Sequence, residues 1–270
     1  TPARSEGNTR IYSDEHLNKL LDIVSLVQSG IKVSAACTYD NNQRLKYLEA
    51  ELGKTKGIDG RYEFYISQLL KFGLNYNELA FNKILNNCIK NNGLDKTYQF
   101  IIHPLLQRVG LLWRKDEVCP GQEHFLTNII RQKLMVMIDQ ISLSSQNRAT
   151  WLLFLPADEG HDIALLYASY MLRNLGFKVI YLGEKVPLES VKKIIENNKI
   201  DHLLLFMVRQ RPVIEANNYL NTLANRYDGL RIHLSGNSEL IKSLNLNEKI
   251  NHIQSISQFH TFLHQLTHAI

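Results

Sequence analysis

Two patterns of apolar and polar residues divide this chain of 270 residues. From residue 13 to about residue 143, apolar residues recur at intervals of three and four, which is the spacing of one face of an α-helix. After the polar run 144–150, short apolar runs alternate with amphipathic stretches, as they do in β–α units. The pattern therefore predicts a helical part followed by an α/β part.

The helical part is predicted to begin at Ser13, because serine before a helical pattern can accept a hydrogen bond from a first-turn N–H. Apolar residues at helical spacing carry this helix to Gly30. We expect a further helical turn over 32–36 and a longer polar helix over 41–52. The residues 1–10 are polar and cannot bury a core, so we expect a loop or a small β-wing there.

Four further helix-length segments follow the glycines at positions 57 and 60. Asn92-Gly93 and the stretch 119–121 supply breaks between the later segments. Four amphipathic helices of such length form a bundle when their apolar faces meet. The predicted helices are 61–72, 76–91, 95–113 and 121–143.

The C-terminal part reads as five β–α units. Continuous apolar strands separated by helices are typical of an open parallel sheet with helices on both faces, so a flavodoxin-like five-stranded fold is predicted. Ligands of such sheets bind beyond the carboxyl ends of the strands. The predicted strands are 151–155, 179–182, 203–208, 230–234 and 250–253, and the predicted helices are 161–175, 187–197, 213–226, 237–244 and 256–268.

Composition indicates an ordinary soluble protein, with 44% apolar and 21% charged residues. We find no apolar stretch of the roughly 20 residues that span a bilayer and no secretory signal, so we expect a cytoplasmic location and no membrane partner. The cysteines Cys37, Cys88 and Cys119 are widely separated and odd in number, which fits a reducing compartment. A net charge of +5 is compatible with nucleic acid but is a weak signal alone.

The loop after the first predicted strand, 156–162, places a histidine and several carboxylates where a doubly wound fold builds its site. His161 could bind a metal through one ring nitrogen while Asp158 or Asp162 accepts a hydrogen bond from the other. The same residues could instead be first-turn residues that suit the positive end of the following helix.

The remaining histidines have less specific patterns. His202, His233 and His252 fall at predicted strand edges, and the stripe at positions 260, 264 and 268 is expected to be a solvated or interface face of the last helix. We find no phosphate-cradling loop, no Ser-His-Asp arrangement and no His-Glu-x-x-His helix. No enzymatic activity is predicted.

The stretch Glu159-x-His161, with Arg173-x-x-Gly176 and Val179-x-x-Leu182-Gly183 after it, resembles a cobalamin-binding domain. The resemblance implies that His161 is the lower axial ligand of cobalt, which would make the protein metal-binding. It also implies that Asp158, Glu159 or Asp162 orients the imidazole.

Three positions depart from that family's pattern. Ala164 stands where the family has glycine, Met207-Val208-Arg209 stands where it has Ser-x-Leu, and Ser235-Gly236 stands where it has Gly-Gly. In the family, small residues there leave room for the nucleotide tail of cobalamin between sheet and helix. The resemblance implies that Ser235 and Gly236 contact the cofactor. A bulky Met207 or Arg209 could fill that channel.

A second resemblance lies in the predicted bundle, where Trp113 is followed ten positions later by Glu123-His124, with Thr127 one turn beyond. This spacing is similar to the helical cap over the upper face of cobalamin in MerR-type light and cobalamin sensors. The resemblance implies that these four residues pack against the ligand. Arg114 stands where light-sensing members have a histidine, which argues against photochemical switching.

The N-terminal stretch from Arg4 to Leu17 resembles the wing and following helix of MerR-family DNA-binding domains. The resemblance implies phosphate contacts by Arg4 and Arg10, which position a protein on DNA without reading sequence. The helix-turn-helix that would precede the wing is not among these residues, so we expect them to bind DNA weakly by themselves.

Together these resemblances imply a bacterial transcriptional regulator that acts on DNA as a homo-oligomer, a dimer or a tetramer, with adenosyl- or methylcobalamin as its ligand. Two alternatives stay open, a cofactor-free dimerisation or interaction module and a corrinoid carrier for methyl transfer. The expected domains are a partial DNA-binding domain at 1–58, a four-helix cap at 59–146 and a cobalamin-binding-like α/β domain at 147–270.

Overall fold

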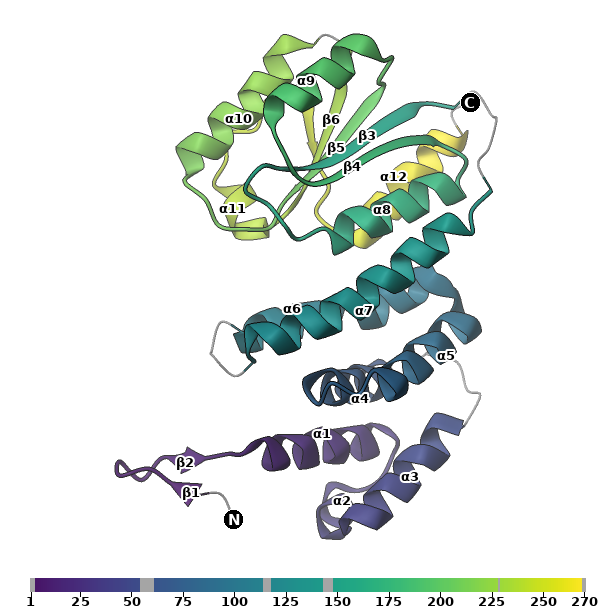
Figure 1. The fold of residues 1–270 in the computed structure, drawn as a ribbon, viewed down its shortest axis with the longest axis vertical. Helices are drawn as coiled ribbons and strands as arrows, with labels where there is room; N and C mark the ends of the chain where they lie inside the picture. Colours follow the sequence, from purple (N-terminus) through teal and green to yellow (C-terminus); the bar gives the residue numbers. More distant parts are fainter. Residues whose placement is uncertain (1–2, 54–60, 114–117, 143–147, 228, 269–270) are drawn as a thin grey trace. The chain divides into compact units, whose positions relative to one another are not determined.

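The computed structural model describes residues 3–53, 61–113, 118–142, 148–227 and 229–268. The chain forms two compact units, Thr1–Ile130 and Arg131–Ile270, each of which is described by itself (Figure 1). The predicted domain boundaries at 58/59 and 146/147 lie outside the described residues.

The first unit opens with a small antiparallel hairpin of β1(Ala3–Arg4) and β2(Arg10–Ile11), which is the predicted wing. Its turn contains Asn8 with a φ of 61°. Three helices follow it. They are α1(Asp14–Gln28), α2(Val33–Thr38) and α3(Asn41–Gly53), close to the predicted ranges.

Ser13 caps α1 as predicted. Its hydroxyl accepts a hydrogen bond from the backbone N–H of His16 at 3.4 Å, and Nδ1 of His16 accepts the N–H of Ser13 at 3.2 Å. This reciprocal arrangement satisfies backbone donors that a helix start otherwise leaves unpaired.

The four predicted bundle helices are present, with two irregularities. Gly93 has φ 76° and ψ 164°, so it interrupts the second helix where the Asn92-Gly93 pair predicts a break. A π-helical turn that the sequence pattern does not predict then joins the next helix. The elements are α4(Tyr62–Leu74), α5(Glu78–Thr97), η1(Tyr98–Ile102), α6(His103–Trp113) and α7(Pro120–Asp139).

A buried acidic residue links α1 to α4. Asp22 is 2% exposed, and its carboxylate lies 2.6 Å from Nζ of Lys71. Gln68 of the same helix donates a hydrogen bond to the Ser25 hydroxyl at 2.8 Å. A charge at this depth is tolerated only when it is paired and hydrogen-bonded.

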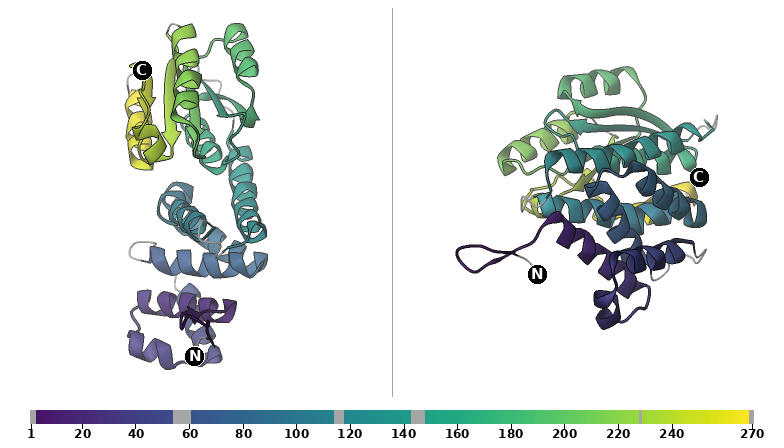
Figure 2. Two further views of the ribbon diagram at one scale, coloured as in Figure 1. Left: turned by 90° about the vertical axis from the view of Figure 1, so that its left-hand side faces the viewer. Right: turned by 60° about the horizontal axis from the view of Figure 1, so that its bottom comes forward.

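The second unit is built on a five-stranded parallel sheet with the order β4-β3-β5-β6-β7, covered by helices on both faces (Figure 2). The predicted fold class is confirmed. The strands are β3(Thr150–Pro156), β4(Lys178–Val186), β5(His202–Met207), β6(Arg231–Gly236) and β7(Ile250–His252), and the helices are α8(Ile163–Asn174), α9(Leu188–Asn197), α10(Val213–Arg226), α11(Ser238–Lys242) and α12(Ile256–His268).

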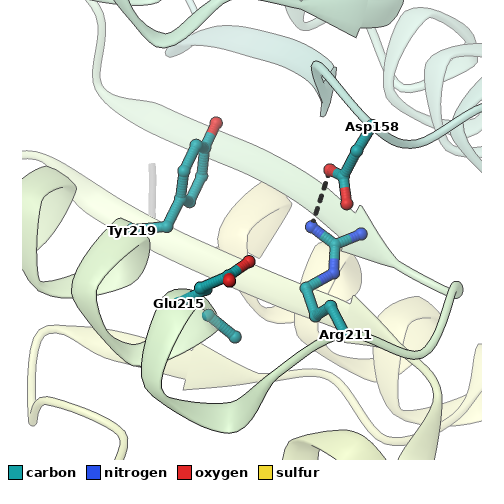
Figure 3. A pocket seen from close by; sticks show the side chains of 5 residues that line it. Asp158, Arg211, Glu215 and Tyr219 are labelled. Atoms are coloured by element: carbon teal, nitrogen blue, oxygen red, sulfur yellow. Dashed lines mark hydrogen bonds and ion pairs between the residues drawn. The ribbon is translucent and has the colours of Figure 1, made fainter.

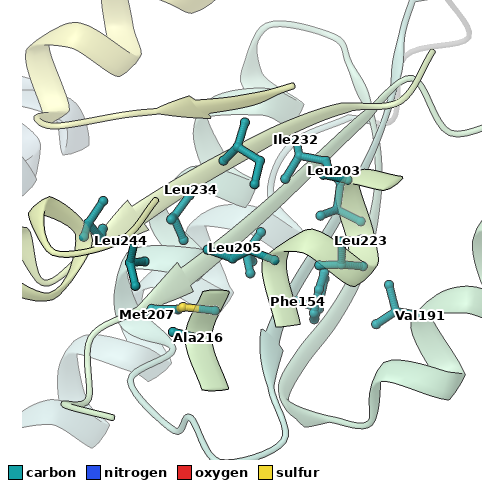
Figure 4. Close-up of a cluster of buried hydrophobic side chains, with 14 of the residues drawn as sticks. Phe154, Val191, Leu203, Leu205, Met207, Ala216, Leu223, Ile232, Leu234 and Leu244 are labelled. Atoms are coloured by element: carbon teal, nitrogen blue, oxygen red, sulfur yellow. The ribbon is translucent and has the colours of Figure 1, made fainter. Parts of the chain in front are cut away.

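Alternate residues of the strands face the two helical layers. Leu152 and Phe154 of β3 belong to one buried cluster together with side chains of α9, α10 and α11 (Figure 4). Trp151 points to the other face, where its ring meets Phe262 of α12. The strand order reverses between β3 and β5, and the loops after these strands meet at the carboxyl edge of the sheet.

No helix within the described ranges has the length and apolar content that a membrane span requires.

Candidate functional site

The loop between β3 and α8 carries the predicted histidine and carboxylates at the carboxyl edge of the sheet. Glu159 is the anchor of this loop, since its side chain is completely buried. Its Oε2 accepts the backbone N–H groups of Val208 and Arg209, each at 2.8 Å, and Nη2 of Arg211 lies 3.2 Å away. Its Oε1 contacts Nδ1 of His161.

These contacts decide the ionisation of Glu159. Burial by itself would raise the pKa of the carboxyl group, but hydrogen bonds from His161 and from the N–H groups of Arg209 and Val208 outweigh it and lower the pKa to about 2. Glu159 is therefore a carboxylate over the physiological range of pH.

The side chain of His161 is 62% exposed although its partner is buried. A neutral imidazole bonded to a carboxylate through Nδ1 carries its proton there, which leaves Nε2 with the lone pair that a metal needs. The pair fixes both the tautomer and the orientation of the ring.

The other two acidic residues of the loop are held by arginines. Asp158 lies 3.0 Å from Nη1 of Arg211, and Asp162 receives a bidentate contact from Arg131 of α7 at 2.8–3.0 Å. Both carboxylates therefore have a strong partner in an arginine, and a role of either one in orienting His161 stays a prediction.

Ser235 and Gly236 serve the fold of the sheet. The Ser235 hydroxyl donates to the carbonyl of Ile253 at 2.8 Å. Gly236 has a φ of 136°, and a Cβ there would lie 2.2 Å from the carbonyl oxygen of Met207. The glycine is thus required by the close approach of β6 to β5, and a contact of either residue with a ligand stays a prediction.

The two bulky residues predicted to fill the nucleotide channel behave differently. Met207 is completely buried in the cluster beside Ala216 of α10 (Figure 4). Arg209 is exposed, and its backbone rather than its side chain contacts Glu159. Arg209 therefore does not fill the interior, because its charged group stays in solvent.

Two histidines form a buried stack that the sequence pattern did not reveal. His202 and Trp151 stack with ring centroids 4.3 Å apart, and Nδ1 of His202 lies 2.9 Å from Nε2 of His233. Burial lowers the pKa of His202 to about 4 and that of His233 to about 3. His202 begins β5 as expected for a strand edge, whereas His233 lies inside β6, and both are neutral core residues.

Across the described residues, no group of three or more His, Cys, Asp or Glu side chains could hold a metal ion.

In the first unit, Trp113 ends α6 and is 52% exposed. Glu123 and His124 lie in the first turns of α7, with 3.5 Å between the carboxylate and Nε2. Thr127 donates its hydroxyl to the carbonyl of Glu123 at 2.8 Å. The predicted departure at Arg114 lies outside the described residues.

Both wing arginines are exposed. Nη1 of Arg4 donates to Oδ1 of Asn8 across the hairpin turn at 2.6 Å, which stiffens the hairpin. Arg4 and Arg10 thus both lie on the surface of the β1–β2 hairpin.

Comparison with protein families gives a match between residues 65–137 and the model of the B12 binding domain. The match covers the helices from α4 to α7, which include Trp113 and Glu123-His124.

Two curated relatives come from Myxococcus xanthus. The HTH-type transcriptional repressor CarH is 26% identical over 226 residues, which cover 83% of this chain and 75% of the relative. The HTH-type transcriptional repressor CarA is 24% identical over 212 residues, which cover 78% of this chain and 68% of the relative. The resemblance drawn from the motifs is confirmed.

Among solved structures, the monomethylamine corrinoid protein of Methanosarcina barkeri matches with a TM-score of 0.59. The two chains are 13% identical, and the match covers 73% of this chain and 96% of the other. This likeness shows a shared fold, helical first and then α/β. The B12 binding domain match supports cobalamin as a candidate ligand.

Proposed function

We propose that this chain is the sensing and oligomer-forming part of a bacterial transcriptional regulator, with a MerR-type head at its N-terminal end and cobalamin as its ligand. The similarity to two repressors and the B12 binding domain match support this proposal. The observation that carries it is the contact between the buried Glu159 carboxylate and Nδ1 of the exposed His161.

The donor set of this loop fits cobalt. An imidazole binds a metal through one nitrogen when a carboxylate holds the other, and Glu159 is itself fixed by two backbone N–H groups. We therefore assign Nε2 of His161 as the atom that would bind the cobalt of cobalamin. Bound cobalamin would supply a metal centre that accepts an imidazole nitrogen as a ligand.

We propose that four residues of the helical unit also contact the ligand. Trp113 has an apolar ring that is half exposed. Glu123 and His124, ten positions later in the motif, form a polar pair. Thr127 bonds back to the helix and fixes the first turn of α7. The assignment of these four residues rests on the family motif.

The hairpin with Arg4 and Arg10 suits contacts with phosphates, which would position the head on DNA. Paired half-sites are read by a symmetric dimer, so the regulator would act as a dimer or as a tetramer built from two dimers. Cobalamin would shift the balance between assemblies by its different affinity for each. The role is regulatory, and no catalytic turnover is assigned.

The domain limits that go with this function are 1–58 for the partial DNA-binding domain, 59–146 for the cap and 147–270 for the α/β domain. They follow the change in sequence pattern. The match to the family model, at 65–137, lies inside the proposed cap.

A cofactor-free dimerisation module is the second candidate. The observation that favours it is that Met207, Ser235 and Gly236 are all used by the fold, at the positions where the family keeps small residues for the nucleotide tail. A ligand that needs a channel there would meet a packed interior.

An absorption spectrum decides between these candidates. The purified protein is incubated with adenosylcobalamin and with hydroxocobalamin, and free ligand is removed by gel filtration in the dark. We expect retained colour for the wild type, with a spectrum that changes in His161→Ala. The matched control is His252→Ala, which removes a half-buried histidine at the end of β7.

A spectrum that changes in His161→Ala and is unchanged in His252→Ala would support the assignment of His161. No retained colour with any variant would instead favour the cofactor-free module. Gel filtration of the same samples gives the oligomeric state with and without ligand.

A further inference from the structure

A small pocket lies where the loops after β3 and β5 meet α10, with a volume of about 130 Å³ (Figure 3). It adjoins the Glu159–His161 pair through Arg211, which contacts both Asp158 and Glu159. Neither the family motifs nor the predicted site includes Arg211, Glu215 or Tyr219. The lining residues are Asp158, Arg211, Glu215, Ala216 and Tyr219.

Two buried polar atoms of the pocket residues have no hydrogen-bond partner among the described residues. They are Nε of Arg211 and the hydroxyl of Tyr219. The Arg211 side chain is only 8% exposed, and its other two nitrogens are used by Asp158 and Glu159. Because buried polar groups are nearly always paired, a missing acceptor is expected beside these two donors.

The charge of the pocket decides what kind of acceptor fits. Asp158 and Glu215 line it with two carboxylates, while the guanidinium of Arg211 already serves Asp158 and Glu159. An anion would meet more negative than positive charge. The ligand group that fits has a neutral oxygen and N–H groups. The oxygen would accept hydrogen bonds from Arg211 and Tyr219, and the N–H groups would donate to the two carboxylates.

That combination is a primary carboxamide. Its carbonyl oxygen accepts two hydrogen bonds, and its nitrogen donates two. The pocket is larger than a single water requires and smaller than the roughly 300 Å³ of a typical drug-sized site. It suits a group of a few heavy atoms, either as a small molecule or as a side arm of a larger ligand.

We propose that this pocket binds a primary carboxamide, with Arg211 Nε and the Tyr219 hydroxyl as donors and Asp158 and Glu215 as acceptors. Where the amide is one of the side-chain amides of cobalamin, the proposal rests on the proposed function. Where it is a small free amide, the pocket is a separate site that reaches His161 through Arg211 and Glu159.

The first experiment tests the pocket without cobalamin. Binding of propionamide to the full chain is followed by saturation-transfer NMR, with propionate and butanone as probes that lack the neutral NH2 group. We expect propionamide to bind and both analogues to bind more weakly. Tyr219→Phe is expected to weaken propionamide binding about 3- to 10-fold, since one hydrogen bond is lost.

Two variants complete this test. Arg211→Lys keeps the positive charge but removes Nε, so it is expected to weaken propionamide binding as Tyr219→Phe does. Tyr227→Phe is the control, because its hydroxyl is also buried but does not line the pocket. Equal binding of propionamide and propionate, or unchanged binding to Tyr219→Phe, would overturn the proposal.

The second experiment identifies the source of the amide. Hydroxocobalamin and its monocarboxylate derivatives, each with one side-chain amide hydrolysed, are compared by absorption after gel filtration. If a corrin amide enters the pocket, one derivative binds the wild type less well than cobalamin does, and Tyr219→Phe reduces this difference. If propionamide binds and cobalamin is not retained, the pocket stands as a site for free amides and the proposed function fails.

Discussion

The carboxylate of Glu159 accepts a hydrogen bond from Nδ1 of His161, two residues further along the chain, so a buried anion orients an exposed imidazole. The anion is held in turn by the backbone of the loop after β5. The position of the imidazole therefore depends on the loops that follow β3 and β5, which are neighbours in the sheet at the point where the strand order reverses.

Replacing Glu159 by glutamine should reduce the acid sensitivity of the α/β unit between pH 4.5 and 2. The pKa of Glu159 is about 2 in the fold against 4.5 as a free group, so its contribution is present above pH 4.5 and is lost as the pH falls toward 2. The shift corresponds to roughly 3 kcal/mol. Urea unfolding at several pH values should give a flatter pH dependence for Glu159→Gln than for the wild type in this window.

Glu248→Gln is the control for that measurement, because Glu248 is exposed. Its pH dependence should follow the wild type. A Glu159→Gln profile that is parallel to the wild type between pH 4.5 and 2 would contradict the role of the buried carboxylate.

The sequence predicted most of the fold because the period of the apolar residues is a local signal. The strand from Trp151 and the helix from Ser13 each appear within a residue or two of the expected place. The π-helical turn at Tyr98–Ile102 was missed, because a shift of the helix ladder by one residue leaves the apolar spacing almost unchanged.

The site was less predictable. The motif identified His161, but three carboxylates near it were equally good partners by sequence. Glu159 is the carboxylate that contacts His161 because residues about fifty positions away hold the loop. The backbone N–H of Val208 binds Glu159, and the guanidinium of Arg211 binds Asp158. Such long-range pairings carry no local periodicity, and the pocket beside Tyr219 was missed for the same reason.

The contact between Arg131 and Asp162 should stabilise the second unit. It is bidentate, and the aspartate is only 9% exposed at its side chain. We expect Arg131→Lys to destabilise the protein by about 1 kcal/mol and Arg131→Ala by about 2 kcal/mol, since the lysine keeps the charge but loses the fork geometry. Unfolding in urea with a double-mutant cycle against Asp162→Asn measures the pair, and additive effects would exclude the coupling.

The first unit offers a test of a buried charge. Lys71→Met leaves the Asp22 carboxylate without its closest partner, and we expect a loss of about 3 kcal/mol. Adding Asp22→Asn should recover part of that loss, because a neutral amide is less costly to bury. Thermal and urea unfolding check the order of the three proteins. A double variant less stable than Lys71→Met would speak against this explanation.

The stacked histidines should make the protein sensitive to mild acid. The pKa values of His202 and His233 lie below the ordinary value of 6.5, so their contribution is complete above pH 6.5 and is lost as the pH falls toward 4 and 3. We expect His233→Phe to reduce the slope of stability against pH between 6.5 and 4. An unchanged slope in urea unfolding would mean that His233 takes up its proton at the same pH in the folded and the unfolded chain.

Gly236 should tolerate no side chain. A Cβ would lie 2.2 Å from the carbonyl oxygen of Met207, and the φ of 136° is one that other residues rarely adopt. Gly236→Ala is therefore expected to destabilise the protein by more than about 3 kcal/mol, since backbone on both strands must move.

Gly229→Ala is the matched control. Gly229 also has a positive φ, of 83°, but it has open space where a Cβ would lie. We therefore expect this variant to lose only about 1 kcal/mol. Comparable unfolding midpoints for the two variants would show that β6 can move away from β5, and that the packing of the strands leaves room beside Met207.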